Sequence, residues 1–213
     1  MKSTIFKLTN PIYEIVDNQF QQFDEIYKVP TLPAYAILNH DLNRNAPDID
    51  GLNNTTNYEI IEDTIRIKNV DPIPEGLTTI CSLTLFYAGI RDYSLLFPHI
   101  NDPKLKERLG QFAEEADNAL QNGSWMSFTI MAISAIEGLL FNEIGNKKLK
   151  QLIDKAHKIG ILNNNEKELL HSAREVRNRV HAGLFEQPLA DRISSTDLYV
   201  LYDQLIKKDW YNS

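Results

Sequence analysis

Cysteine is nearly absent from this 213-residue sequence, and that scarcity excludes several classes of site. Cys81 is the one cysteine, so no intrachain disulfide can form, and no Cys/His cluster has the spacing of zinc ligands. This composition favours a reducing, intracellular setting. We therefore expect a cytoplasmic protein that carries no metal and no cofactor.

Long hydrophobic runs are also missing. The most apolar stretch, residues 128–140, is too short to span a bilayer and contains Ser134 and Glu137. The N-terminus lacks the apolar run of a signal peptide. We expect neither a membrane partner nor secretion.

Positive charge is in the minority. Lys and Arg number 22 against 29 Asp and Glu, which gives a formal net charge of −7 and a pI near 5.3. An acidic chain repels nucleic acid on average, so any nucleic-acid site must be a local basic patch. The sequence also has no glycine-rich phosphate loop.

The N-terminal part carries mixed patterns. Asn10-Pro11 and the helical spacing of the apolar residues that follow predict a helix over 11–28. The Asn-, Asp- and Gly-rich residues 40–57 predict an exposed loop. Alternation within 58–70 predicts one or two short strands, and a turn follows at 71–76.

From Leu77 onward the spacing of apolar residues is helical. The helix predicted over 125–144 is apolar nearly all round, which is typical of the centre of a bundle. We expect a mostly α protein with an N-terminal α+β extension over 1–76 and a helical bundle over 77–213. The predicted bundle helices cover 77–92, 104–120, 125–144, 147–159, 165–182 and about 194–210.

The helix predicted over 165–182 gathers polar side chains on one face. At about 100° per residue, Arg174 and His181 lie roughly 20° apart, and Arg177 and His181 roughly 40° apart. Asn178 flanks the same face. Two guanidinium groups on one face repel each other unless a negative group lies between them, and that group is either a phosphate ligand or a carboxylate such as Glu137. There are two alternative interpretations. Glu137 and one of the two arginines can form a purely structural ion pair, and His181 can be a histidine at a helix C-terminus, where the helix macrodipole favours it.

These helices and their motif resemble one known family. The order is the apolar helix with Ala135-Ile136-Glu137-Gly138, a short basic helix, a Gly/Asn turn, and then Arg174-Glu175-Val176-Arg177-Asn178-Arg179-Val180-His181. Over residues 104–210 this order resembles the HEPN superfamily, whose signature is an arginine followed after four to six residues by a histidine. Arg174 has that spacing to His181, whereas Arg177-Asn178 matches the family's arginine–polar dipeptide with only three residues before His181. The N-terminal hundred residues resemble no family that we can name.

The resemblance implies a metal-independent endoribonuclease that pairs as a homodimer, in a bacterial toxin–antitoxin or antiphage-defence setting. A ribose 2′-hydroxyl would attack the neighbouring phosphate, a step that suits a histidine for proton transfer and a guanidinium for the phosphate charge. His181 would then be the acid/base, Arg177 or Arg174 the phosphate clamp, and Asn178 an orienting group. Five lysines of the short basic helix would extend a track for the RNA backbone, unless they are simply solvated: Lys147, Lys148, Lys150, Lys155 and Lys158.

Two other functions stay open from the sequence. One is a non-catalytic HEPN-like module that dimerises and binds a nucleotide, RNA or a protein partner such as an antitoxin or regulator, which the acidic pI and the irregular motif favour. The other is a purely structural interaction domain, if Glu137 neutralises the arginines.

Overall fold

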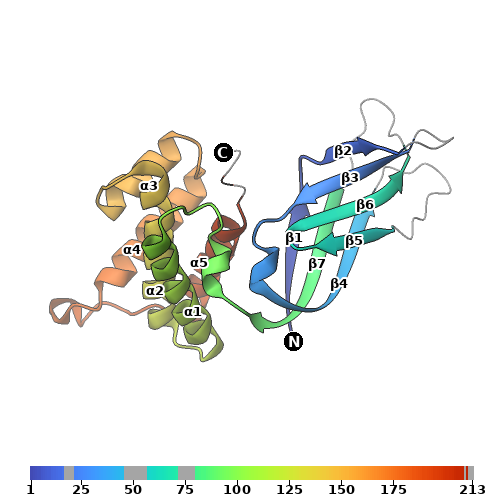
Figure 1. Cartoon of the computed structure of the whole chain (residues 1–213). Helices are drawn as coiled ribbons and strands as arrows, with labels where there is room; N and C mark the ends of the chain where they lie inside the picture. Colours follow the sequence, from blue (N-terminus) through green and yellow to red (C-terminus); the bar gives the residue numbers. More distant parts are fainter. Residues whose placement is uncertain (17–21, 46–56, 72–79, 209, 211–213) are drawn as a thin grey trace. The chain divides into compact units, whose positions relative to one another are not determined.

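The computed structural model of the chain describes residues 1–16, 22–45, 57–71, 80–208 and 210. Contacts divide the chain into two compact units, Met1–Asp92 and Tyr93–Ser213. The first contains two antiparallel β-sheets and the second is helical, so the fold is α+β (Figure 1). The predicted mostly α fold class is therefore wrong.

Seven strands are present in the described part of the first unit. Their orders in the sheets are β1-β7-β4 and β2-β3-β6-β5, and every neighbouring pair is antiparallel. The strands are β1 (Lys2–Leu8), β2 (Ile12–Ile15), β3 (Phe23–Lys28), β4 (Tyr35–Asn45), β5 (Tyr58–Ile61), β6 (Thr64–Val70) and β7 (Ile80–Ile90), with a 3-10 turn, η1 (Leu32–Ala34), before β4.

The core of the first unit follows the two-residue period of its strands. Cys81, Leu83 and Leu85 of β7 are buried and alternate with partly exposed neighbours. Ile65 and Ile67 of β6 do the same in the other sheet. Each sheet thus has one apolar face that is removed from water.

Two predicted helices are strands instead. The predicted helix 11–28 is wrong, because β2 and β3 pair as an antiparallel hairpin; its residues 17–21 lie outside the described part. The predicted helix 77–92 is also wrong, because residues 80–90 form β7 between β1 and β4. Both segments are rich in β-branched and aromatic residues, and pairing with strands distant in sequence overrides their helical spacing.

The strand prediction for residues 58–70 is confirmed by β5 and β6. Within the loop predicted at 40–57, residues 40–45 instead belong to β4, and 46–56 lie outside the described residues. Because β7 belongs to the first unit, the division falls between Asp92 and Tyr93 rather than after residue 76.

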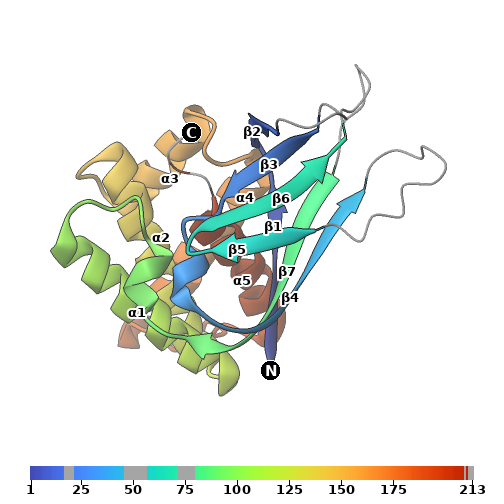
Figure 2. The same cartoon turned by 45° about the vertical axis from the view of Figure 1, so that its right-hand side comes forward.

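The second unit is built around one apolar helix. Its elements are η2 (Tyr93–Leu96), α1 (Pro103–Gln121), α2 (Trp125–Ile144), α3 (Leu149–Lys158), α4 (Asn164–Asn178), η3 (Ala182–Leu184) and α5 (Arg192–Lys207). Helix α2 contacts α1, α3, α4 and α5, and eight of its residues are buried (Figures 1 and 2). The predicted central position of residues 125–144 is confirmed.

Helix α2 is also long and apolar enough to cross a membrane by length and composition. This is weak evidence, because the core helix of a soluble protein passes the same test. The burial of α2 among four other helices is that of such a core helix, and the unit has the form of a soluble domain.

Candidate functional site at the end of helix α4

Helix α4 is fixed firmly at its start. Asn163 Oδ1 accepts a hydrogen bond from the Glu166 N–H at 3.0 Å, and Glu166 Oε2 accepts one from the Asn163 N–H at 2.7 Å. This reciprocal arrangement satisfies two backbone donors that a helix leaves free. Leu170, Ala173 and Val176 then point into the bundle, so the polar residues between them face outward.

The end of α4 lies earlier than the sequence predicts. The helix stops at Asn178, so the predicted extent to residue 182 is wrong. Beyond it, the Arg179 N–H donates to the Val176 carbonyl and the His181 N–H donates to the Asn178 carbonyl, at 3.0 and 3.3 Å. These bonds span three residues, so the chain tightens and leaves the helix. The backbone of His181 is extended, with φ −73° and ψ 130°. His181 therefore does not share a helical face with Arg174 and Arg177.

Arg177 forms the expected ion pair with the central helix. Its Nη1 donates to Glu137 Oε2 at 2.9 Å. About a third of each side chain is exposed, 30% for Arg177 and 34% for Glu137. The pair joins α4 to α2 and fixes the position of the guanidinium group, while the other N–H groups of Arg177 remain without a partner in the described residues.

Arg174 has a different partner. It pairs with the neighbouring Glu175, and its Nε is buried without a hydrogen bond in the described part of the chain. Both arginines of the predicted motif therefore have a carboxylate beside them.

His181 and Asn178 are the uncommitted members of the cluster. His181 is exposed and Asn178 is partly exposed. Within the described residues, neither side chain makes a hydrogen bond. The turn after α4 thus leaves an imidazole and an amide free to bind a ligand near Arg177.

Arg179 also contacts this region, although its position on the predicted helix points away from the polar face. Its Nη1 donates to the Pro188 carbonyl at 2.7 Å and so ties the segment after α4 to the helix end. No motif signals a contact of this kind. The hydrogen bond restrains the chain on the far side of His181.

Several large apolar side chains are exposed in the segment that follows α4 and on α5. Phe185 is 81% exposed and Ile193 is 74% exposed. Three more are at least half exposed: Val180, Leu189 and Val200. We call these five residues the apolar rim. The signal available in the sequence was a concentration of apolar residues in a segment that contains Gly and Pro. We did not predict an apolar surface from it.

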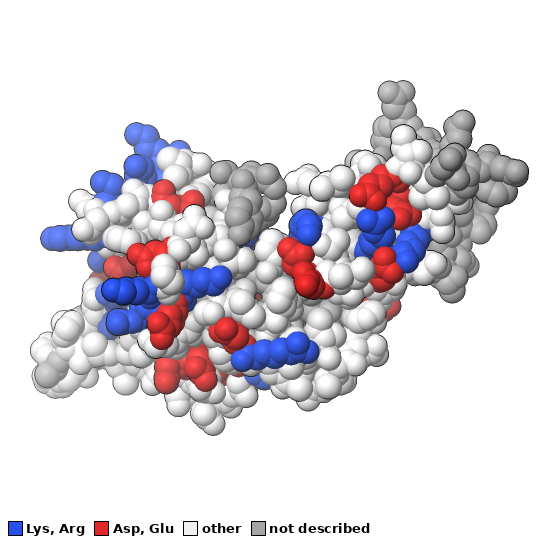
Figure 3. Space-filling view, in the orientation of Figure 1, with Lys and Arg blue, Asp and Glu red and all other residues white. Residues whose placement is uncertain are grey.

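Of the five lysines predicted on one short basic helix, Lys150, Lys155 and Lys158 lie on α3, whereas Lys147 and Lys148 precede it. Lys147, Lys148, Lys150, Lys155 and Lys158 are all exposed. None has an ion pair within the described residues. Figure 3 shows blue side chains gathered over the part of the helical unit that Figure 1 labels α3.

A polar contact joins the middle of α3 to α4. Asp154 Oδ1 lies 3.1 Å from His171 Nε2 and 3.7 Å from Lys167 Nζ. The hydrogen bond with His171 is the main cause that lowers the pKa of Asp154. The negative charge within the lysine cluster therefore already has partners.

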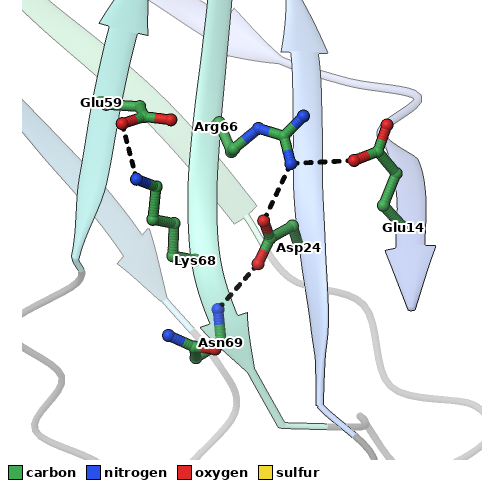
Figure 4. A network of polar contacts seen from close by, with 6 residues as sticks. All are labelled: Glu14, Asp24, Glu59, Arg66, Lys68 and Asn69. Carbon is green, nitrogen blue, oxygen red and sulfur yellow. Dashed lines mark hydrogen bonds and ion pairs between the residues drawn. The ribbon is translucent and has the colours of Figure 1, made fainter. Parts of the chain in front are cut away.

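A charged network in the first unit was not foreseen (Figure 4). Arg66 Nη1 lies 2.8 Å from Glu14 and 3.0 Å from Asp24, and Lys68 pairs with Glu59 at 2.6 Å. Asp24 also accepts from the Asn69 N–H at 3.0 Å. Both cations of the network have carboxylate partners, and three carboxylates face two cations, so the network braces β2, β3, β6 and β5 rather than offering a free cation.

The second polar group that the sequence did not reveal is buried between the sheets. Arg44 of β4 donates from Nη2 to Glu25 Oε1 at 2.9 Å and from Nε to Glu25 Oε2 at 3.1 Å, and the Tyr27 hydroxyl donates to Glu25 Oε2. The side chains of Arg44 and Glu25 are 5% and 0% exposed. Burial, helped by the charge of Glu25, raises the pKa of the adjacent Cys81 thiol to about 11 and that of Tyr27 well above its usual range. Such a thiol is protonated and inert at neutral pH.

Among the described residues, no group of three or more His, Cys, Asp and Glu side chains is placed to hold a metal ion. Comparisons with protein-family models, with curated proteins and with solved structures found no match to this chain. The function of this protein is therefore inferred from the geometry of the helical unit and from the motif resemblance.

Proposed function

We propose that this protein is a HEPN-like, metal-independent endoribonuclease whose site lies at the end of α4. The observation that carries the proposal is the anchored guanidinium of Arg177, followed by a turn in which the side chains of Asn178 and His181 make no hydrogen bond within the described residues. The resemblance in motif and helix order supports the same assignment.

The reaction would be an internal transesterification. The ribose 2′-oxygen bonds to the adjacent phosphorus while the bond from phosphorus to the 5′-oxygen breaks, which leaves a cyclic phosphate and a 5′-hydroxyl. One proton leaves the 2′-hydroxyl and one joins the departing 5′-oxygen, and His181 is the group that transfers protons. Arg177 binds the phosphate as negative charge develops, with Arg174 as the alternative clamp, and Asn178 orients it by hydrogen bonding.

Dimerisation would complete this site. The residues of the apolar rim lie in the chain just before and after His181 and on α5, and exposed large apolar side chains that gather on one surface commonly mark an interaction site. A second copy of the chain packed on the rim would bring two copies of His181 to one cleft, so that one takes a proton while the other donates one. We place the dimer in the cytoplasm, in a toxin–antitoxin or antiphage-defence system.

A non-catalytic binding module is the second candidate. Arg177 and Arg174 both have carboxylate partners, and His181 has left the helix that carries them. A site of this kind would hold a nucleotide, an RNA or a protein partner through Arg177 and Asn178 without cleaving it.

Cleavage of total RNA in the presence of EDTA tests the enzyme against the module. The wild type should cleave with EDTA present, since no step uses a metal, and His181→Ala should lose at least about a hundredfold in rate, as expected for loss of a general acid/base. His40→Ala, which removes an exposed histidine of the first unit, is the control and should cleave like the wild type. No cleavage by folded wild-type protein would contradict the proposed activity and leave the binding module.

Light scattering coupled to size-exclusion chromatography tests the dimer. The wild type should elute with the mass of two chains, and Ile193→Asp should give one chain. Ile159→Asp places the same charge on an exposed isoleucine outside the apolar rim and should leave the dimer intact. A wild-type protein with the mass of one chain would rule out this assembly.

A further inference from the structure

Helix α3 and the two residues before it combine a buried apolar face with exposed lysines that form no ion pair in the described residues. Leu149, Leu152, Ile153 and Ala156 are at most 6% exposed and pack into the bundle. At 100° per residue, the lysines at 150, 155 and 158 spread over the opposite, outward side. Lys147 and Lys148 extend the charge beyond the first turn.

This cluster stands out against the rest of the chain. It places five positive charges within twelve residues of a chain whose net charge is −7. Several other cations have carboxylate partners, as Lys28, Arg66 and Arg177 do. The lysines of α3 form no ion pair in the described residues, and the acid among them, Asp154, pairs with His171 and Lys167 of α4, with a smaller contribution from the charge of Lys150.

We infer that the outward side of α3 binds the sugar–phosphate backbone of the RNA on which the proposed nuclease acts. The inference rests on the proposed function for the choice of RNA as ligand. Lysine ammonium groups contact phosphates as point charges and release counterions when they do so. Helix α3 is about 15 Å long, which spans several phosphates of an extended strand.

Other anionic partners fit the surface less well. A helix that lies on a membrane inserts its apolar face, and the apolar face of α3 is already buried in the bundle. A protein interface is usually centred on aromatic or other large apolar anchors, and the outward residues of α3 are lysines, Gln151 and Asp154. No aromatic side chain lies among them to stack on bases. Binding is therefore independent of base sequence.

Fluorescence anisotropy with the full-length protein tests this inference. The probes are a labelled single-stranded RNA with 2′-O-methyl riboses, which cannot undergo the internal attack, and a DNA strand of the same base sequence. The wild type should bind both strands, with a linear fall of log affinity against log salt. Lys150→Gln/Lys155→Gln/Lys158→Gln should reduce the magnitude of that slope by about 2 and weaken binding about tenfold or more in about 0.1 M KCl.

The matched control removes three other exposed cations of the same unit. Lys104→Gln/Arg108→Gln/Arg192→Gln makes the same change in net charge outside α3 and should keep the wild-type slope. Equal weakening by the two triple variants would overturn the inference, because the effect would then reflect net charge alone. Failure of the wild type to bind either strand would also overturn it, as would equally tight binding of poly-glutamate, which would show a general anion surface.

The readout separates this inference from the proposed function. Binding of the uncleavable strand requires no catalysis, so α3-dependent binding without RNA cleavage would remove the nuclease proposal and keep the docking surface. Cleavage that survives in the α3 triple variant at full affinity would keep the nuclease and remove the docking surface.

Discussion

At the scale of single residues, Glu25 and Arg44 form the most deeply buried ion pair in the described part of the first unit. The two side chains are removed from water and depend on each other and on Tyr27 for hydrogen bonds. For Arg44, burial alone would lower the pKa, but its hydrogen bond with Glu25 and the charge of that residue outweigh burial and raise it. Removing one partner leaves a buried charge uncompensated, whereas replacing the whole group by apolar residues does not.

We therefore expect Arg44→Met to lower the free energy of unfolding of the first unit by about 3 kcal/mol or more. The triple variant Glu25→Leu/Arg44→Met/Tyr27→Phe should recover most of that loss. Hydrogen exchange of the β7 amides in increasing urea measures both. A triple variant that is no more stable than Arg44→Met would show that the buried polar group contributes more than charge compensation.

His99 gives the second unit a dependence on acid. Its ring stacks on Trp210 with 5.3 Å between centroids, and its Nε2 is buried without a partner in the described residues. Burial, with a smaller contribution from the charge of Lys106, lowers its pKa from 6.5 to about 4. The folded protein thus disfavours the protonated ring.

The sign of the effect follows from linkage. The neutral ring of His99 stabilises the folded unit fully above the unfolded pKa of 6.5, and this stabilisation is lost as the pH falls toward the folded pKa of about 4. We expect the free energy of unfolding, measured by urea denaturation with tryptophan fluorescence, to decrease over that range by up to about 2 kcal/mol after allowance for solvent screening. His99→Phe keeps the stacking without the titrating group and should flatten the curve between these pH values. An unchanged slope in this variant would assign the pH dependence to other groups.

At the scale of elements, Gly110 lets α1 pass close to the backbone of η2. A Cβ at this position of α1 would lie 2.8 Å from the backbone nitrogen of Ser94 in η2. Backbone cannot rotate away as a side chain does, so η2 would have to move.

Gly110→Ala should therefore destabilise the helical unit by about 1–3 kcal/mol despite the better helix propensity of alanine. Denaturant unfolding followed by tryptophan fluorescence measures the loss. Gly183→Ala is the control, because a Cβ there meets nothing within 4 Å. Equal stability of the two variants would show that η2 shifts at little cost.

The elements also show how far the sequence could predict this molecule. The helices over 104–120, 125–144 and 147–159 were predictable, because the helical spacing of their apolar residues and the Gly or Asn residues that end them act within a few residues of each other. Segments 11–28 and 80–90 were not, since their apolar spacing fits a helix while their strand partners lie far away in sequence. At the site, the contact between Glu137 and Arg177 could be anticipated from the cost of a lone charge on an apolar helix. The turn that displaces His181 could not, because two local hydrogen bonds decide it.

At the scale of the whole molecule, two cores of different kinds divide the chain. Apolar strand faces form one, and the surroundings of α2 form the other. Since the strands pair with one another in the first unit and the helices pack on one another in the second, the fragment Tyr93–Ser213 should fold alone. We expect a helical far-UV circular dichroism spectrum and one cooperative unfolding transition. A fragment without cooperative unfolding would show that the first unit is required for the second to fold.

The pairing of β1 with β7 has a consequence for synthesis of the chain. Leu8 lies opposite Cys81, so β1 emerges from the ribosome roughly seventy residues before its partner. At ordinary rates of translation, about 5–20 residues per second, the first strand waits several seconds with its hydrogen-bonding edge open. The helices, whose contacts are mostly local, meet no such delay. The β unit is thus the part of the nascent chain that is exposed to mispairing and most dependent on chaperones.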